Sequence, residues 1–199
     1  MEKPIEARLS ERSCTIYKPA RIDLDGRSYL GLMTDISAGG AGLTCPVVPR
    51  PGSIVHLATG DDPLRRATVV WGSGDHFGVR FDEESTRLFS VPGHTYRSVR
   101  VPTDISAALY VNGVRRRARI TNVSPRGVAF ESDAQLVAGA IISLEAGGQA
   151  LENVTIRWSR EGQLGARLPV QVKLPVLQRL VHSGAPRAAE LQLRAKAGR

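Results

Sequence analysis

Apolar and polar residues alternate in short runs along most of the chain, a pattern that predicts β-strands with one buried face. Asp25-Gly26 stands between two such runs and predicts a tight hairpin turn. The run before this turn places four residues on one side of its strand: Ile16, Ala20, Ile22 and Leu24. Asn112-Gly113 predicts a second hairpin, preceded by a run with the same arrangement: Ile105, Ala107, Leu109 and Val111.

The two hairpins belong to an internal repeat. Residues 14–81 align with residues 101–168 without a gap, at a shift of 87 positions, and 14 of the 68 pairs are identical. Many identities are residues that backbone geometry or packing constrains: Gly26/Gly113, Gly40/Gly127, Gly52/Gly139, Gly60/Gly147, Trp71/Trp158 and Gly78/Gly165. The chain therefore carries two copies of one fold.

Each copy is expected to hold six short strands. After the hairpin, strands are expected at 41–45, 54–58, 66–72 and 77–81 in the first copy, and at 128–132, 141–145, 153–159 and 164–168 in the second. Many short strands separated by turns predict a small antiparallel barrel, and closure also removes exposed strand edges. The expected fold class is all-β, with two tandem six-stranded antiparallel β-barrels and a short C-terminal helix.

The pattern divides the chain into five segments. Leucine and valine recur at three- and four-residue spacing from Leu174 to Val181, which predicts an amphipathic helix. The expected segments are an N-terminal arm (1–13), a first barrel (14–90), a linker or arm (91–100), a second barrel (101–173) and a C-terminal helical tail (174–199).

Charge is unevenly distributed. Residues 1–90 hold 11 Lys/Arg and 12 Asp/Glu, whereas residues 91–199 hold 16 and 7. The basic second half favours an anionic partner. Cys14 and Cys45 lie in no metal-binding cluster, and no apolar run approaches the roughly 20 residues of a membrane span. We expect a cytoplasmic protein with reduced thiols, no membrane span and no metal.

No pattern in the chain predicts an enzyme. The four histidines are scattered, and none stands at metal-ligand spacing or beside a nucleophile. The chain contains no Gly-x-Ser-x-Gly, no phosphate-loop Gly-Lys-Ser/Thr and no paired catalytic carboxylates. We therefore expect no catalytic residues and no cofactor.

The most specific motif is Asp/Asn-x-Ser-x-x-Gly, which occurs once in each copy. It comprises Asp35, Ser37 and Gly40 in the first copy, and Asn122, Ser124 and Gly127 in the second. A carboxylate or amide beside a hydroxyl can accept hydrogen bonds from a purine edge. The alternative is a turn in which these side chains only stabilise their own backbone. Recurrence in register favours a binding role, although a shared folding requirement would also preserve the turn.

Arginines precede each motif at a similar distance: Arg8 and Arg12 in the arm, and Arg97 and Arg100 in the linker. Guanidinium groups suit phosphate oxygens and guanine edges. Solvated linker arginines are the plainer interpretation, and the pairing with a motif in each copy favours the binding one.

Together these residues resemble the PilZ family. The resemblance rests on the Arg-x-x-x-Arg arm at Arg8 and Arg12, the two turns, and Gly78-Val79-Arg80-Phe81 at the end of the first copy. The resemblance implies a six-stranded barrel that binds the bacterial second messenger cyclic di-GMP, with the arm folding over the ligand.

Carried over to this chain, the resemblance implies that Arg8 and Arg12 grip phosphate and guanine and that Asp35 accepts from the guanine edge. It also implies that Ser37 and Gly40 shape the pocket. In the second copy the turn residues match, but Tyr96 stands where the first arginine belongs, which leaves Arg97 and Arg100 at a shorter spacing.

Arg115, Arg117 and Arg119 alternate on the second hairpin and are expected to share one face. A solvated basic face is one interpretation, and a docking surface for an acidic partner or for messenger phosphates is the other.

Three functions remain open from the sequence. The first is a cyclic di-GMP receptor that couples messenger binding to a rearrangement of the two barrels and so regulates a protein effector. The second is an interaction adaptor in which one or both copies no longer bind the nucleotide, with a partner on the basic second half and the C-terminal helix. The third, nucleic-acid binding, is disfavoured because the chain has only ten Phe, Trp and Tyr residues and no aromatic run.

Overall fold

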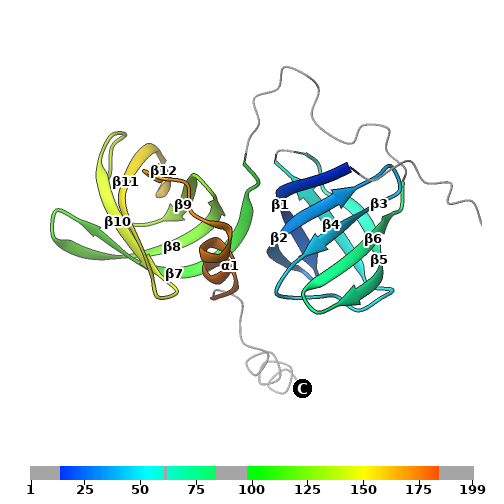
Figure 1. Ribbon diagram of the computed structural model, residues 1–199. Coiled ribbons are helices and arrows are strands. Elements are labelled where there is room, and N and C mark those ends of the chain that lie inside the picture. Colours follow the sequence, from blue (N-terminus) through cyan, green and yellow to red (C-terminus); the bar gives the residue numbers. More distant parts are fainter. Residues whose placement is uncertain (1–13, 61, 84–97, 184–199) are drawn as a thin grey trace, which may run out of the picture.

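The computed structural model describes residues 14–60, 62–83 and 98–183. These residues form two closed barrels with a helix between them (Figure 1). The fold class expected from the sequence is thus confirmed. The arm predicted at 1–13, the linker up to residue 97 and the tail beyond residue 183 lie outside the described residues.

The first barrel closes in the strand order β1-β2-β3-β6-β5-β4. Every neighbouring pair is antiparallel, and pairing of β4 with β1 completes the ring. Its strands are β1 (Cys14–Leu24), β2 (Arg27–Ile36), β3 (Gly40–Thr44), β4 (Ile54–Thr59), β5 (Arg65–Ser73) and β6 (His76–Phe81).

The second barrel repeats this topology, with pairing of β10 and β7 closing the ring. Its strands are β7 (Val101–Val111), β8 (Val114–Ser124), β9 (Gly127–Glu131), β10 (Ile141–Ala146), β11 (Gln149–Arg160) and β12 (Gln163–Arg167). Strand β11 begins before the expected residue 153, because Gly147 (φ 55°) and Gly148 (φ 70°) close a tight hairpin directly after β10.

Alternation along the strands fills each barrel with apolar side chains. The predicted inward faces are confirmed: Ala20, Ile22, Ile105 and Leu109 are at most 3% exposed. Ile16, Leu24, Ala107 and Val111 pack against the two cores from their edges.

The turn between β2 and β3 closes around Gly40. The Ser37 amide donates to the Gly40 carbonyl oxygen over 2.8 Å, and the Ser37 hydroxyl donates to the same oxygen over 3.3 Å. A Cβ on residue 40 would lie only 2.3 Å from the Val79 carbonyl oxygen on β6. Glycine is therefore needed here because β6 passes directly across the turn.

Helix α1 (Leu174–Ser183) lies between the barrels and contacts both (Figure 1). Leu177 and Leu180 are each 1% exposed and belong to the core of the second barrel. Leu30 of β2, in the first barrel, packs into the same cluster. The Gln178 side-chain amide donates to the Leu30 carbonyl oxygen over 3.1 Å. The predicted amphipathic helix is confirmed, and its apolar face holds the two barrels together.

His182 completes this contact near the end of α1. Its ring meets Tyr29 edge-on, with ring centroids 5.6 Å apart. Its Nε2 atom is buried without a hydrogen-bond partner, and burial lowers the pKa of the imidazole. A base whose pKa falls on folding binds its proton more weakly in the native protein than in the unfolded chain. Stability is therefore lost as pH falls below the unfolded pKa of about 6.5.

Leu180→Ala tests the packing of α1. It removes a fully buried side chain, so we expect the free energy of unfolding to fall by about 2–5 kcal/mol. Arg179→Ala, at the exposed neighbouring position on the same helix, should change it by less than about 0.5 kcal/mol. Calorimetric unfolding of both variants measures the difference. Equal midpoints for the two variants would contradict the docked position of α1.

Gly40→Ala tests the close crossing of β6 over the β2–β3 turn. The added methyl meets backbone, which cannot rotate away, so we expect a loss of about 1–3 kcal/mol in urea unfolding. Gly39→Ala is the matched control, because a Cβ at residue 39 meets no atom within 4 Å. The account of this turn is wrong if both alanine variants unfold at the same urea concentration.

Candidate functional site

The first motif lies on the outer surface of the first barrel, where β2 ends and turns into β3. Asp35 and Ser37 are half-buried and close together, and Gly40 begins β3. Cys14, the first residue of β1, pairs with Ile36, so the chain enters the barrel beside the motif. The structure therefore brings Asp35, Ser37 and Gly40 together at one end of the barrel.

The Asp35 side chain lies over the neighbouring strand instead of projecting into solvent. Asp35 is paired with Gly42 of β3, and a Cβ on residue 42 would be 2.1 Å from Asp35 Oδ2. The Thr34 hydroxyl donates to the same oxygen over 3.1 Å. The missing side chain at Gly42 thus gives the carboxylate its place against the barrel wall.

Trp71 lies across the sheet from Asp35, at the other end of a row of paired residues on four neighbouring strands. Gly42 is paired with Gly78 of β6, and Gly78 is paired with Trp71 of β5. A Cβ on residue 78 would lie 2.1 Å from Trp71 Nε1, so the indole covers Gly78. Trp71 as a whole residue remains 48% exposed. Asp35 and Trp71 therefore lean toward each other over a floor of two glycines.

Arg80 adds a cation to this surface. It stands two residues after Gly78 on β6, so both positions face outward, and it is paired with Gly40. Its side chain is exposed. The outer face thus joins a carboxylate, a hydroxyl, an indole and a guanidinium.

These groups suit a guanine nucleotide. A carboxylate accepts two hydrogen bonds from the Watson–Crick edge of guanine. An indole offers a stacking face for a base, and a guanidinium binds phosphate oxygens with paired donors. The bonds from Ser37 to Gly40 also show that the motif stabilises its own turn. The folding role and a binding role are compatible, because Asp35 takes no part in closing the turn.

The second barrel repeats most of this arrangement. The Ser124 hydroxyl donates to the Gly127 carbonyl oxygen over 3.1 Å, and the Trp158 indole covers Gly165. Asn122 stands at the position of Asp35 but is paired with Ala129, which replaces Gly42. The Ala129 methyl group fills part of the space that the Asp35 carboxylate uses in the first barrel. The two surfaces therefore differ in charge and in the depth of the floor.

The structure locates one of the four predicted arginines. Arg100 is exposed and directly precedes β7, and the pairing of Val101 with Val123 sets it level with Ser124. Arg8, Arg12 and Arg97 lie outside the described residues. Each motif stands on its own barrel, so the described residues of the two copies form two separate surfaces.

Four residues of the first surface, Gly42, Trp71, Gly78 and Arg80, were not predicted as site residues from the sequence. Trp71 and Gly78 recur as Trp158 and Gly165, which identified them as part of the repeat but not of a site. Arg80 recurs as Arg167 and was noted within the closing strand, but not as a site residue. Strand register was the missing information, because it sets Trp71 and Arg80 beside a motif that lies more than 30 residues earlier.

Other reactive groups in the described part of the chain form no competing metal or thiol site. Within the described ranges, no group of three or more His, Cys, Asp or Glu residues could hold a metal ion. Burial raises the pKa of the free Cys45 thiol, which belongs to the first core and is unreactive there. No helix among the described residues is long and apolar enough to cross a membrane.

Solved structures with a similar arrangement include three from bacteria. The Borreliella burgdorferi PlzA protein in complex with c-di-GMP shares 12% identity, with 85% of this chain and 87% of that chain covered and a TM-score of 0.36. Bacillus subtilis MotI/DgrA, an inhibitor of motility, shares 11% identity, with 91% of this chain and 99% of that chain covered and a TM-score of 0.35. Escherichia coli YcgR in complex with c-di-GMP shares 14% identity, with 91% of this chain and 87% of that chain covered and a TM-score of 0.31. TM-scores this low support no inference about this chain.

A family assignment comes from the sequence of the first copy. No protein of curated function matches the chain. The family model described as "PilZ domain" matches residues 6–90, a range that contains the first arm, the first motif and the Gly-Val-Arg-Phe strand. Residues 6–90, the first copy with its arm, are thus identified as a PilZ domain.

Proposed function

We propose that the outer face of the first barrel binds cyclic di-GMP and that the protein is a non-catalytic receptor for this messenger. The observation that carries the proposal is the row in which Asp35 and Trp71 face each other over Gly42 and Gly78. The family membership of residues 6–90 supports the same ligand. Location in the cytoplasm, where such a messenger is found, belongs to the proposal.

Each residue has a distinct role in this proposal. Asp35 accepts from the guanine edge, and Trp71 provides a face on which the base stacks. Arg80 pairs with a phosphate, as do Arg8 and Arg12 of the arm. Ser37 and Gly40 hold the turn that sets the direction of Asp35.

The second barrel is the weaker candidate for binding. Asn122, Ser124 and Gly127 keep the turn, and Arg100 and Arg97 precede it. However, Asn122 lacks the charge of Asp35, and Ala129 has a methyl group where Gly42 leaves the backbone of the first barrel uncovered. We therefore propose one cyclic di-GMP site per chain, on the first barrel. If a cyclic di-GMP dimer binds there, the stoichiometry would be two ligand molecules per chain at a single site.

Strand β2 offers a route from ligand to barrel arrangement. It carries Asp35 at one end and Leu30, which packs against the second barrel and α1, nearer the other. A ligand that binds one arrangement of β2 better than another shifts the population toward that arrangement. We propose that this shift changes the contact between the barrels and thereby a surface presented to a protein effector.

An adaptor without ligand is the second candidate function. The observation that favours it is the altered floor of the second barrel, together with its exposed arginines. The earlier expectation that α1 takes part in partner docking is not favoured, because Leu177 and Leu180 of α1 are buried between the barrels.

Calorimetric titration with cyclic di-GMP tests the receptor proposal. We expect Asp35→Ala to weaken binding by roughly tenfold or more, because a hydrogen bond to a charged group contributes about 1.5–3 kcal/mol. Asp75→Ala is the matched control, since Asp75 is an exposed aspartate between β5 and β6, next to the other end of β6 from Arg80.

Asn122→Ala separates the two barrels in the same titration and should leave the affinity unchanged. An absence of heat with the wild-type protein at micromolar concentration would refute the receptor proposal. Loss of binding in Asn122→Ala with retention in Asp35→Ala would move the site to the second barrel.

A further inference from the structure

The two copies differ along one stretch of the second strand of each barrel. We call this stretch the edge of β2 (residues 28–30) in the first copy and the edge of β8 (residues 115–117) in the second. In the first copy, Ser28, Tyr29 and Leu30 of β2 occupy the positions of Arg115, Arg116 and Arg117 of β8 in the second. Leu30 is 1% exposed because α1 and the second barrel cover it. The three arginines are all exposed. An edge that carries a helix in one copy is thus open and basic in the other.

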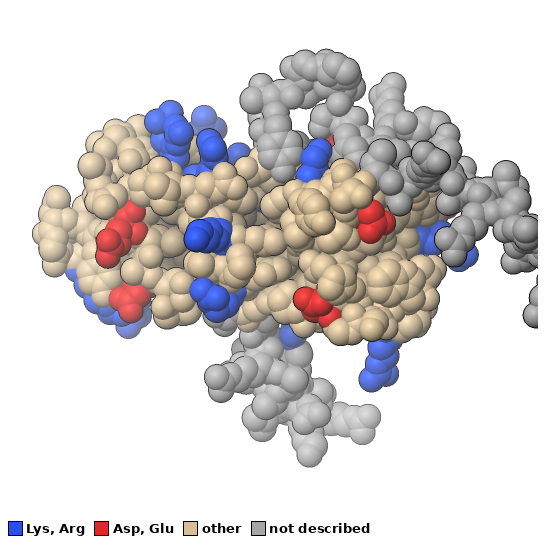
Figure 2. All heavy atoms as spheres, viewed as in Figure 1, with Lys and Arg blue, Asp and Glu red and all other residues tan. Residues whose placement is uncertain are grey.

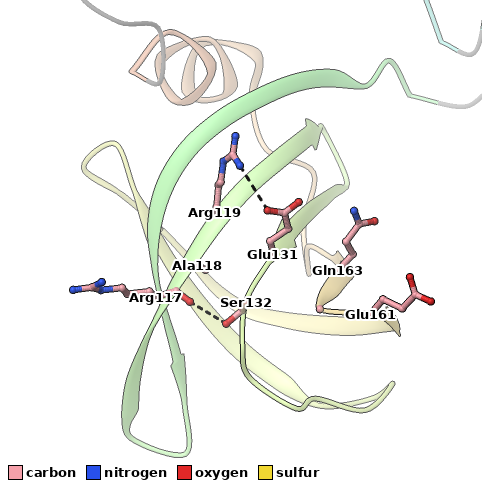
Figure 3. Close-up of a pocket in the computed structure, with 8 residues that line it drawn as sticks. Arg117, Ala118, Arg119, Glu131, Ser132, Glu161 and Gln163 are labelled. Carbon is pink, nitrogen blue, oxygen red and sulfur yellow. Dashed lines mark hydrogen bonds and ion pairs between the residues drawn. The ribbon is translucent and has the colours of Figure 1, made fainter.

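A backbone acceptor at this edge is also repeated. The Leu30 carbonyl oxygen lies 3.9 Å from the Cys45 thiol and accepts the side-chain amide of Gln178 from α1. The equivalent Arg117 carbonyl oxygen accepts the Ser132 hydroxyl over 2.9 Å (Figure 3). Ser132 stands at the position of Cys45, so the local geometry is conserved between the copies. What differs is the helix that occupies the edge in the first barrel.

The edge of β8 also projects beyond its neighbour. Pairing with β9 begins only at Arg119, so residues 114–118 of β8 are paired on one side alone, with β7. The tip of this hairpin points away from the first barrel and from α1 (Figure 1). It is therefore reachable by a partner without separating the two barrels.

The charge of this edge is only partly neutralised. Arg119 donates to Asp104 over 2.5 Å and lies 3.8 Å from Glu131, and its hydrogen bond lowers the pKa of Asp104. In Figure 3 the Arg117 side chain points away from Glu131, toward the opposite side of β8. Among the described residues, Arg115 and Arg117 have no carboxylate within ion-pair distance. Lys and Arg side chains also gather over the second barrel in Figure 2.

A hollow of about 650 Å³ lies beside these two arginines. On the face of these arginines its floor includes the small residue Ala108, which is paired with Arg117, and the Gly147-Gly148 turn borders it. Glu145 at its rim accepts a hydrogen bond from the Tyr110 hydroxyl over 3.1 Å. A small residue in the floor allows another segment to approach the sheet closely, with the arginines beside it.

We propose that this edge of β8 docks an acidic helical segment of a partner protein, in the way that α1 docks on β2. Carboxylates of the segment pair with Arg115 and Arg117, and its small or apolar residues rest on the floor at Ala108. The shape of the edge favours a helix, since a helix sits on its counterpart in the first barrel. This assignment specifies the effector-binding part of the proposed function and does not depend on messenger binding.

Fluorescence anisotropy with defined probes tests this assignment. The probes are a labelled amphipathic helical peptide with glutamates along its polar face, the same peptide with glutamines instead, and a labelled duplex DNA. We expect the full-length protein to bind the glutamate peptide and not the glutamine peptide. The double variant Arg115→Glu/Arg117→Glu should weaken that binding by at least about tenfold, as expected for losing two ion pairs and adding repulsion.

The matched control is Arg157→Glu/Arg160→Glu, which makes the same charge change at exposed positions of β11, three strands away around the barrel. It should retain the affinity for the glutamate peptide. Equal loss in both double variants would overturn the proposal, because binding would then follow net charge alone. Preference for the duplex through Arg115 and Arg117 would overturn the protein partner in favour of nucleic acid.

Circular dichroism and a cyclic di-GMP titration of the same variants keep the outcomes distinct. Both double variants should fold and bind the messenger as the wild type does, because the changed residues lie on the second barrel. A chain that binds the peptide but no messenger would retain the docking edge and lose the receptor function. A chain that binds the messenger but no peptide would retain the receptor function and lack the docking edge.

Discussion

The absence of side chains at Gly42 and Gly78 is the constraint on which the outer face of the first barrel depends. Two paired glycines on neighbouring strands leave a flat strip of backbone on the outside of the barrel. The Asp35 carboxylate and the Trp71 indole fill this strip from opposite sides, so both are held in place by the sheet itself. Side chains held in this way are ordered in the free protein, which would reduce the entropy cost of binding a ligand at the proposed site.

The same strand links that site to the rest of the molecule. Strand β2 presents Asp35 at the motif and Leu30 at the contact with α1, so it joins the outer face of the first barrel to the contact between the barrels. Helix α1 closes the contact by burying Leu177 and Leu180 in the second core. The second barrel repeats the strand order but exposes arginines where β2 is covered. The two copies thus share a strand order and differ in what covers this edge.

Much of the fold was predictable because barrel geometry is encoded locally. Asp25-Gly26 and Asn112-Gly113 fix the hairpins, and alternation fixes which side chains face inward. The site was only partly predictable, because pairing between β3, β6 and β5 is a long-range property. The motif residues could be identified as a group, whereas Trp71 and Arg80 join them only through register. The docking of α1 on β2 was also hidden, since an apolar stripe does not say which surfaces it covers.

Nuclear magnetic resonance of the two indole N–H groups tests the central claim most directly. The chain has only two tryptophans, Trp71 on the first barrel and Trp158 at the equivalent position of the second. On addition of cyclic di-GMP, we expect the Trp71 indole signal to shift because the base stacks on its ring, while the Trp158 signal stays in place. Unchanged signals from both indoles, or a shift of Trp158 alone, would contradict a messenger site on the glycine floor of the first barrel.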